Sequence, residues 1–139
     1  MATPNDPTEF IRQVMPLCET LGIEAVTLAP EEVVLTLEWT PGLCTSGGVL
    51  HGGAVMALAD SAGAACAFLN LPDGASGTST IESKTNFLRA VREGTAIATA
   101  RPLHVGSGTV VVETEVTNDH HLVAKVMQTQ VVLGGTARR

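Results

Sequence analysis

The stretch HGGAVMALADSAGAACAFLN, residues 51–70, sets a histidine, two glycines and one carboxylate in a run of small apolar residues. A Gly- and Ser-rich loop precedes it and good helix formers follow, which predicts a helix that begins near His51. The first turn of a helix has backbone N–H groups without intrahelical partners and carries the positive end of the helix dipole. Glycine there lets a ligand approach closely, so Gly52 could donate to a carbonyl oxygen that becomes negative during acyl transfer.

The carboxylate in this run, Asp60, lies eight residues beyond Gly52, which is about 12 Å along a helix axis. Its side chain cannot reach a carbonyl held at the start of its own helix. Two copies packed about a two-fold axis with antiparallel helices would bring Asp60 of one chain to Gly52 of the other. We expect the apolar neighbours Met56 and Leu58 to disfavour the charged carboxylate and so make it a better base or nucleophile. A structural aspartate that caps a loop or pairs with a buried base is the alternative.

Other nucleophiles in the chain lack the partners that their chemistry requires. A serine hydrolase needs an elbow such as GxSxG, which is absent, and Ser61 merely follows Asp60. The three cysteines, Cys18, Cys44 and Cys66, form no CxxC pair, so we expect core thiols and neither a disulfide framework nor a zinc site. The three histidines outside the run are expected at the surface: His104, His120 and His121.

The length and composition are those of one folded domain. The chain has 139 residues, of which 45% are hydrophobic, enough for a packed core. We therefore expect a single domain over residues 1–139, with an N-terminal helical segment over 1–21. The opening MATPNDPTEF has neither a basic region nor an apolar run, and no segment reaches the roughly 20 apolar residues that span a bilayer. A cytoplasmic location is the expectation, without contact with membranes.

The net charge of −6 is unevenly distributed along the chain. Residues 1–78 hold nine acidic residues and one basic residue, whereas residues 79–139 hold seven basic and five acidic residues. An acidic chain with few aromatic residues is a poor nucleic-acid binder. The basic residues of the second half could form a local patch for a small polyanion, or simply a solvated surface of mixed charge.

The pattern elsewhere predicts the elements around the central helix. Residues 8–21 have apolar positions at helical spacing, with Pro16 expected to kink or split the helix. Two extended segments flank Pro30, and four β-like runs follow at 78–88, 95–105, 109–116 and 122–133. The connections between these runs have hairpin lengths, so we expect consecutive hairpins in an antiparallel sheet. An apolar helix wrapped on one side by such a sheet leaves a face for a second copy.

Two segments, GGVLHGGAVMALADSAGAACA and KTNFLRAVREGT, resemble the acyl-CoA thioesterases of the hotdog fold, the branch typified by the phenylacetate-pathway thioesterase PaaI. The resemblance extends from about Gly22 to Leu133. It implies an α+β fold in which a long central helix is wrapped by a curved antiparallel sheet of about six strands. It also implies homodimers that usually pair into homotetramers, and hydrolysis of an acyl-CoA to a free acid and CoA. No metal and no cofactor is implied, coenzyme A being part of the substrate.

The same resemblance implies roles for residues in the matching positions. Gly52 would supply the N–H to the thioester oxygen, His51 would help form that end of the site, and Asp60 would act as nucleophile or general base. A hydroxyl on the strand after the helix would orient the attacking water, and among residues 78–80 we favour Thr80.

Four further positions are expected to bind substrate under this resemblance. Gly53 follows the oxyanion donor, and Arg89 and Ser107, the latter in the Gly106–Ser107–Gly108 turn, would contact the phosphates of CoA. Relatives often carry Asn or Gln six residues before the histidine, where this chain has Thr45. The shorter hydroxyl side chain reaches less far toward the substrate or the attacking water.

Two other functions are compatible with parts of this pattern. Hydratases and dehydratases of the same fold pair a histidine with an acid in other arrangements, and no Asp-x-x-x-x-His occurs here. A non-catalytic acyl-CoA binder or sensor would use the same pocket, but a pure binder gains nothing from a desolvated Asp60. The acyl group is expected to be aryl or arylacetyl from the PaaI resemblance, although the small residues of the helix leave room for a medium chain.

Overall fold

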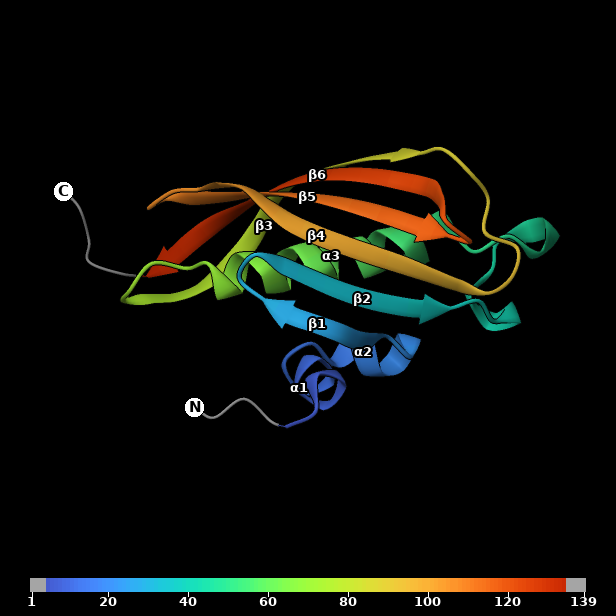
Figure 1. Cartoon of the computed structure of the whole chain (residues 1–139), viewed down its shortest axis with the longest axis horizontal. Helices are drawn as coiled ribbons and strands as arrows, with labels where there is room; N and C mark the ends of the chain where they lie inside the picture. Colours follow the sequence, from blue (N-terminus) through green and yellow to red (C-terminus); the bar gives the residue numbers. More distant parts are fainter. Residues whose placement is uncertain (1–4, 135–139) are drawn as a thin grey trace.

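Six antiparallel strands form one curved sheet, and a long helix lies along its inner face (Figure 1). The structure, a computed structural model, describes residues 5–134. Its helices are α1 (Pro7–Val14), α2 (Pro16–Leu21) and α3 (Gly52–Leu69), with two 3-10 turns at Pro41–Leu43 and Ser46–Gly48. Its strands are β1 (Glu24–Ala29), β2 (Glu32–Glu38), β3 (Ala75–Phe87), β4 (Thr95–Val105), β5 (Thr109–Asn118) and β6 (His121–Gly134). The expected helix wrapped by six strands is confirmed.

The strand order, β1-β2-β4-β5-β6-β3, differs from the expected run of hairpins in one place. The links β1–β2, β4–β5 and β5–β6 are hairpins, but β3 pairs with β6, with Phe87 opposite Ala124. The prediction of a β3–β4 hairpin is therefore wrong. The connection instead crosses the end of the sheet toward β4 (Figure 1), and the Leu50 N–H donates to the Val91 carbonyl on the way. Connection length alone does not separate a hairpin from such a crossing.

The core lies between the inner face of the sheet and α3. On β2, Leu35 and Leu37 are fully buried, as strand alternation requires. On β4 the inward residues are the alanines at 96, 98 and 100, and on α3 they include Ala59 and Ala62. Small residues on both surfaces let the helix approach the sheet closely. By length and mean hydropathy α3 could cross a membrane, but half of it is buried within the fold, as in the core helix of a folded domain.

The opposite face of α3 is left uncovered by the sheet. Met56, Asp60, Ala64 and Phe68 recur every four residues and so share one face of the helix. The side chains of Met56 and Phe68 are 42% and 52% exposed. This outer face of α3 is thus apolar, solvent-facing, and interrupted by one carboxylate. It is the face for which the sequence predicted a second copy.

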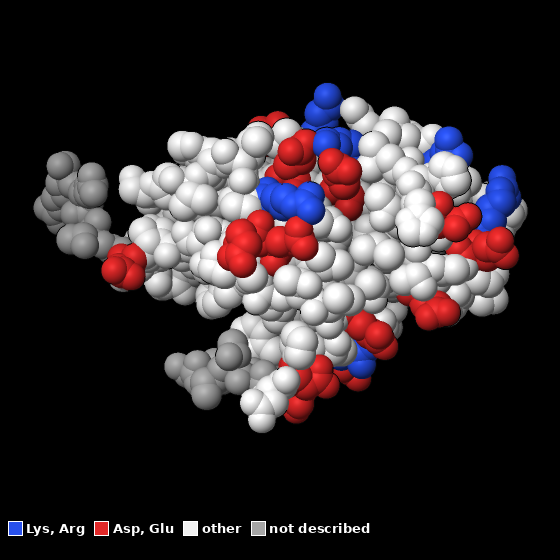
Figure 2. Space-filling model, in the orientation of Figure 1, with Lys and Arg blue, Asp and Glu red and all other residues white. Residues whose placement is uncertain are grey.

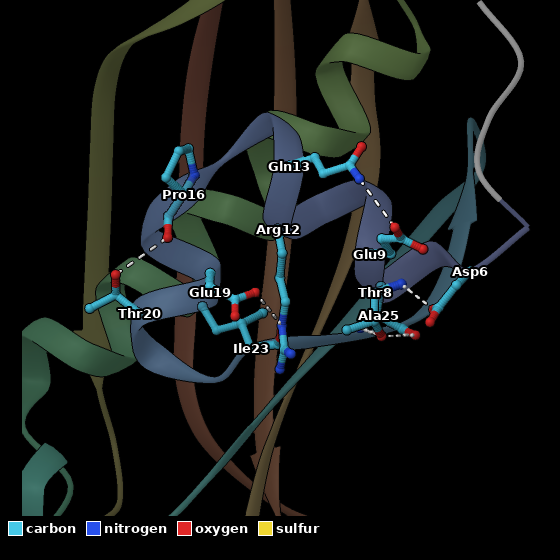
Figure 3. A network of polar contacts seen from close by, with 10 residues as sticks. All are labelled: Asp6, Thr8, Glu9, Arg12, Gln13, Pro16, Glu19, Thr20, Ile23 and Ala25. Atoms are coloured by element: carbon cyan, nitrogen blue, oxygen red, sulfur yellow. Dashed lines mark hydrogen bonds and ion pairs between the residues drawn. The ribbon is translucent and has the colours of Figure 1, made fainter.

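Hydrogen bonds connect α1 to β1 and to Ile23, the residue just before this strand (Figure 3). The helical segment is split before Pro16, as expected, and Gly22 ends α2 with a positive φ of 77°. Arg12 Nε donates to the Ile23 carbonyl at 3.0 Å, and the Ala25 N–H donates to Thr8 Oγ1 at 3.0 Å. These contacts hold α1 along β1, with Ile11 buried against the core.

Charged side chains of both signs are interspersed on the face drawn in Figure 2. Lys125 on β6 lies within ion-pair distance of Glu113 and Glu115 on the neighbouring β5. These carboxylates raise the pKa of the Lys125 ammonium through hydrogen bonds. Arg101 pairs with Glu32 at 2.6 Å. Two basic residues of the second half are therefore engaged with glutamates.

Candidate active site

His51 caps the N-terminus of α3 and selects which glycine can donate to a ligand. Its backbone is extended, with φ −60° and ψ 134°, and its Nδ1 accepts the Gly53 N–H at 2.7 Å. The ring therefore satisfies one of the unpaired donors of the first turn. Among residues 5–134, no acceptor takes the Gly52 N–H. Gly52 thus offers the free donor, while the N–H of Gly53 is engaged within the chain.

Gly52 stands at the wall of a groove that also includes two predicted substrate contacts. A β-carbon added at Gly52 would lie 3.2 Å from Cζ of Phe87, which closes over the helix start from the end of β3. The groove has a volume of about 380 Å³, and its lining includes Thr45, Gly52, Phe87 and Arg89. Thr45 and Arg89 are exposed at its surface. The fold therefore brings both residues to the helix end that carries the free N–H.

The Asp60 carboxylate is exposed in the single chain, yet one of its oxygens is held by two donors. Oδ1 accepts from Thr80 Oγ1 at 3.0 Å and from Gln128 Nε2 at 2.9 Å. The prediction that apolar neighbours desolvate this group is wrong for the single chain, because the outer face of α3 is open to solvent. Of the three hydroxyls at 78–80, the favoured Thr80 is the one that contacts Asp60.

Sequence reasoning missed two glutamines that support this contact. Gln128 and Gln130 on β6 are 1% and 0% exposed and face the helix. Gln130 Nε2 donates to Thr80 Oγ1 at 2.5 Å, and Thr78 Oγ1 lies 3.2 Å from Gln130 Oε1. Their signal in the sequence was alternation, since in VMQTQVV both glutamines occupy positions that strand periodicity assigns to the buried face.

An apolar pocket lies beyond Asp60 along the same helix face. Its volume is about 300 Å³, and α1, the second half of α3 and the start of β3 line it. Ala64 and Phe68, one and two turns beyond Asp60, contribute from α3, and Phe10 contributes from α1. The carboxylate thus stands between a groove at the N-terminal end of α3 and an apolar pocket at its C-terminal end.

Ser107 lies far from the other predicted substrate contacts of its own chain. It occupies the β4–β5 turn, next to the pairing of Thr109 with Val131, whereas the Arg89 N–H donates to the Val123 carbonyl. The eight-residue separation along β6 corresponds to roughly 25 Å. Arg89 and Ser107 of one chain therefore do not meet at a single phosphate.

Cys18 and Cys66 are buried and have the properties of packed thiols, whereas Cys44 is only half-buried, so the expectation of a core thiol is wrong for Cys44. Burial raises the pKa of Cys66 to about 11, and it also raises the pKa of Cys18. Because the thiolate is the nucleophile, both residues are poor candidates for covalent catalysis. The three histidines expected at the surface are exposed: His104, His120 and His121.

The chain is similar in sequence and in structure to several known proteins. The family model described as Thioesterase superfamily matches residues 47–125. The 1,4-dihydroxy-2-naphthoyl-CoA hydrolase of Listeria monocytogenes is 34% identical over 106 residues, covering 76% of this chain and 85% of that protein. A thioesterase of Haemophilus influenzae superposes with a TM-score of 0.85 at 25% identity, over 99% of this chain and 97% of the other. The PaaI protein of Escherichia coli superposes with a TM-score of 0.82 at 26% identity, over 94% and 93% of the two chains.

Proposed function

Because this chain belongs to the thioesterase superfamily and is a thioester hydrolase, we propose that it hydrolyses a small aryl or arylacetyl-CoA at sites shared between two protomers. Gly52 of one protomer binds the thioester oxygen, and Asp60 of its partner attacks or activates water. The observation that carries the proposal is the position of the Asp60 carboxylate. Among Met56, Asp60, Ala64 and Phe68 on the outer face of α3, Asp60 is the charged residue, and its Oδ1 accepts hydrogen bonds from Thr80 and Gln128.

Two uncovered surfaces support a dimer of this kind. Of the two edge strands, β1 is lined by α1, whereas no described element lies along the outer edge of β3. That edge is 13 residues long and exposes Ile81 at 62% and Phe87 at 52%, a surface that proteins seldom leave open. The outer face of α3 is apolar as well. Antiparallel packing of α3 on its copy, with Asp60 beside Gly52 of the partner, puts Met56 on the two-fold axis, since it is the midpoint of 52 and 60.

The proposed hydrolysis uses two groups that have no hydrogen-bond partner among the described residues, the Gly52 N–H and Asp60 Oδ2. The Gly52 N–H, at the positive end of the helix dipole, donates to the thioester oxygen as charge develops on it. Asp60 Oδ2, which receives no hydrogen bond from residues 5–134, faces the acyl carbon. As a nucleophile it bonds to that carbon and expels the CoA thiolate, and water then hydrolyses the anhydride. As a general base it takes a proton from the water that attacks. Both routes require the same placement.

The two cavities favour an aromatic acyl group. The CoA arm leaves through the groove beside Thr45 and Arg89, and the acyl group enters the apolar pocket of the partner. That pocket is at the small end of the range for ligand sites, and its lining includes Phe10 and Phe68, whose rings favour aromatic contacts. The Listeria relative is named for an aromatic acyl-CoA. A short aryl group therefore fits better than a long chain.

The experiment follows thiol release from matched aryl and aliphatic acyl-CoAs. We expect the highest kcat/KM with benzoyl- or phenylacetyl-CoA. Asp60→Asn keeps the size of the side chain and should lower kcat about 10²- to 10⁴-fold. Asp73→Asn, which changes an exposed aspartate in the loop after α3, serves as the matched control and should retain activity. Equal turnover by the wild type and Asp60→Asn would remove the catalytic role of Asp60, and a preference for long aliphatic chains would contradict the acyl assignment.

A further inference from the structure

Two buried glutamines on β6, Gln128 and Gln130, lie next to the contact between Asp60 and Thr80. Gln128 and Gln130 are almost completely shielded from solvent, and burying an amide is costly unless its polar atoms find partners. Their amide nitrogens have partners, and all the contacts converge on the Asp60–Thr80 pair. We propose that Gln128, supported by Gln130, is a positioning residue that fixes Asp60 with Oδ1 engaged and Oδ2 free for the reaction. The inference rests on the proposed function of Asp60.

The donors and acceptors of this network are consistent with one another. The Thr80 hydroxyl has a single hydrogen, which it donates to Asp60 Oδ1 at 3.0 Å. Its lone pairs accept from Gln130 at 2.5 Å and from Gln128 at 3.4 Å. Gln128 Nε2 also donates to Asp60 Oδ1, at the shorter distance of 2.9 Å. Only the amide nitrogen can donate to a carboxylate, so these contacts also fix the orientation of the Gln128 amide.

A glycine in α3 makes room for the Gln128 amide. Gly63 lies three residues beyond Asp60, and an added β-carbon there would lie 1.9 Å from Gln128 Oε1 and 2.5 Å from its Cδ. Any larger residue at position 63 must displace the amide from Asp60. Gln128 Oε1 itself is buried without a hydrogen-bond partner among the described residues. The Gln128 amide therefore has hydrogen bonds on its nitrogen side, to Asp60 and Thr80, and none on its oxygen side among the described residues. This arrangement is expected of a side chain whose role is to orient the Asp60 carboxylate.

The first test uses Gln128→Met, which keeps the length of the side chain and removes the amide. We expect kcat to fall about ten- to hundredfold with KM nearly unchanged, because a hydrogen bond to a charged group is lost while the substrate contacts remain. Thr114→Val is the matched control, since it removes a buried hydroxyl on the adjacent β5 that has no hydrogen-bond partner in the described range 5–134. Its kinetics should match the wild type. A folded Gln128→Met enzyme with wild-type kcat would overturn the inference.

The second test couples Gly63 to Gln128. Gly63→Ala should lower kcat in the wild type but should have no further effect in a Gln128→Ala background, where no amide remains to displace. Additive losses in the double variant would contradict the proposed link. The single Gly63→Ala variant also serves if Gln128→Met fails to fold, because it leaves the glutamine in place, and a wild-type kcat in Gly63→Ala would then contradict the inference.

A spectroscopic readout separates this inference from the proposed function. The carboxyl ¹³C resonance of Asp60, assigned by its loss in Asp60→Asn, should move in Gln128→Met and Gly63→Ala and stay in place in Thr114→Val. A wild type that hydrolyses no thioester would contradict the proposed function, and the resonance would then decide the Gln128 contact by itself. An unmoved resonance in both variants would refute the positioning role.

Discussion

The amide of Gln128 and the carboxylate of Asp60 lie 2.9 Å apart, although 68 positions separate them in the chain. The contact joins β6, the last strand in the chain, to the middle of the central helix α3. Asp60 Oδ1 is thus held by hydrogen bonds, whereas Oδ2 receives none from residues 5–134. The proposed chemistry depends on this difference between the two oxygens and on the Gly52 N–H, which has no acceptor within the described part of the chain.

The oxyanion donor can be tested by removing one hydrogen. Gly52 is the first residue of α3, where proline is tolerated, and His51 before it already has an extended backbone. Gly52→Pro should lower kcat about 10²- to 10³-fold relative to Gly52→Ala. Both variants add the same β-carbon against Phe87, but only proline removes the N–H. Comparable kcat values for these two variants, measured with thermal melting as the folding control, would rule out Gly52 as the donor.

Arg89 should act on the nucleotide part of the substrate. Arg89→Ala should raise KM for the acyl-CoA about tenfold, because a charge-assisted contact with phosphate is lost. KM for the matching N-acetylcysteamine thioester, which lacks the nucleotide, should not change. Arg101→Ala, which removes an arginine already paired with Glu32, is the control. An equal rise in KM for both substrates would argue against a phosphate contact.

The two-fold axis can be located through Met56. In a Cys44→Ser background, Met56→Cys should form a covalent dimer under mild oxidation or with a short bis-maleimide, because antiparallel helices bring this position close to its own copy. Val26→Cys, on the outer part of β1 and 64% exposed, should remain monomeric in denaturing gels. Efficient crosslinking at Val26 but not at Met56 would contradict the proposed helix pairing.

Stability should fall at alkaline pH because of Cys66. Burial holds the pKa of this thiol at about 11, above its ordinary value of 9.0. Above about pH 9 the unfolded chain therefore loses a proton that the folded chain keeps, so the free energy of unfolding decreases as pH rises toward 11. The loss at about pH 10 should be about 1 kcal/mol. Urea unfolding at about pH 8 and about pH 10 should show a smaller decrease for Cys66→Ala, and an equal decrease would reject this assignment.

The parts of the site that could be predicted from sequence are those set by short-range spacing. The glycines at the helix start and the eight-residue interval to Asp60 lie within one element, so helix geometry alone relates them. The partner of Asp60 on β6 could not be reached in this way, because it depends on how β3 and β6 pair. Strand alternation could have identified Gln128 and Gln130 as inward-facing polar residues, but it does not indicate which residues they contact.

Two of the errors have physical causes of the same kind. The β3–β4 connection has a hairpin length, and only the register of β3 with β6 shows that it crosses the sheet. Asp60 has apolar neighbours in the sequence, which predicted a desolvated carboxylate. The structure instead places it on the helix face that the sheet leaves open to solvent. In both cases the local sequence pattern was read correctly. The strand pairing and the solvent exposure were determined by elements distant in the sequence.

In the proposed dimer, each site takes its donor from one protomer and its carboxylate from the other. Asp60→Asn and Gly52→Pro chains, each nearly inactive alone, can be coexpressed with different tags and purified as mixed dimers. One of the two sites in such a dimer carries both changes and the other carries neither. We predict recovery of about half of the wild-type kcat per dimer. Mixed dimers no more active than their parents would contradict a shared site and place both groups in the same chain.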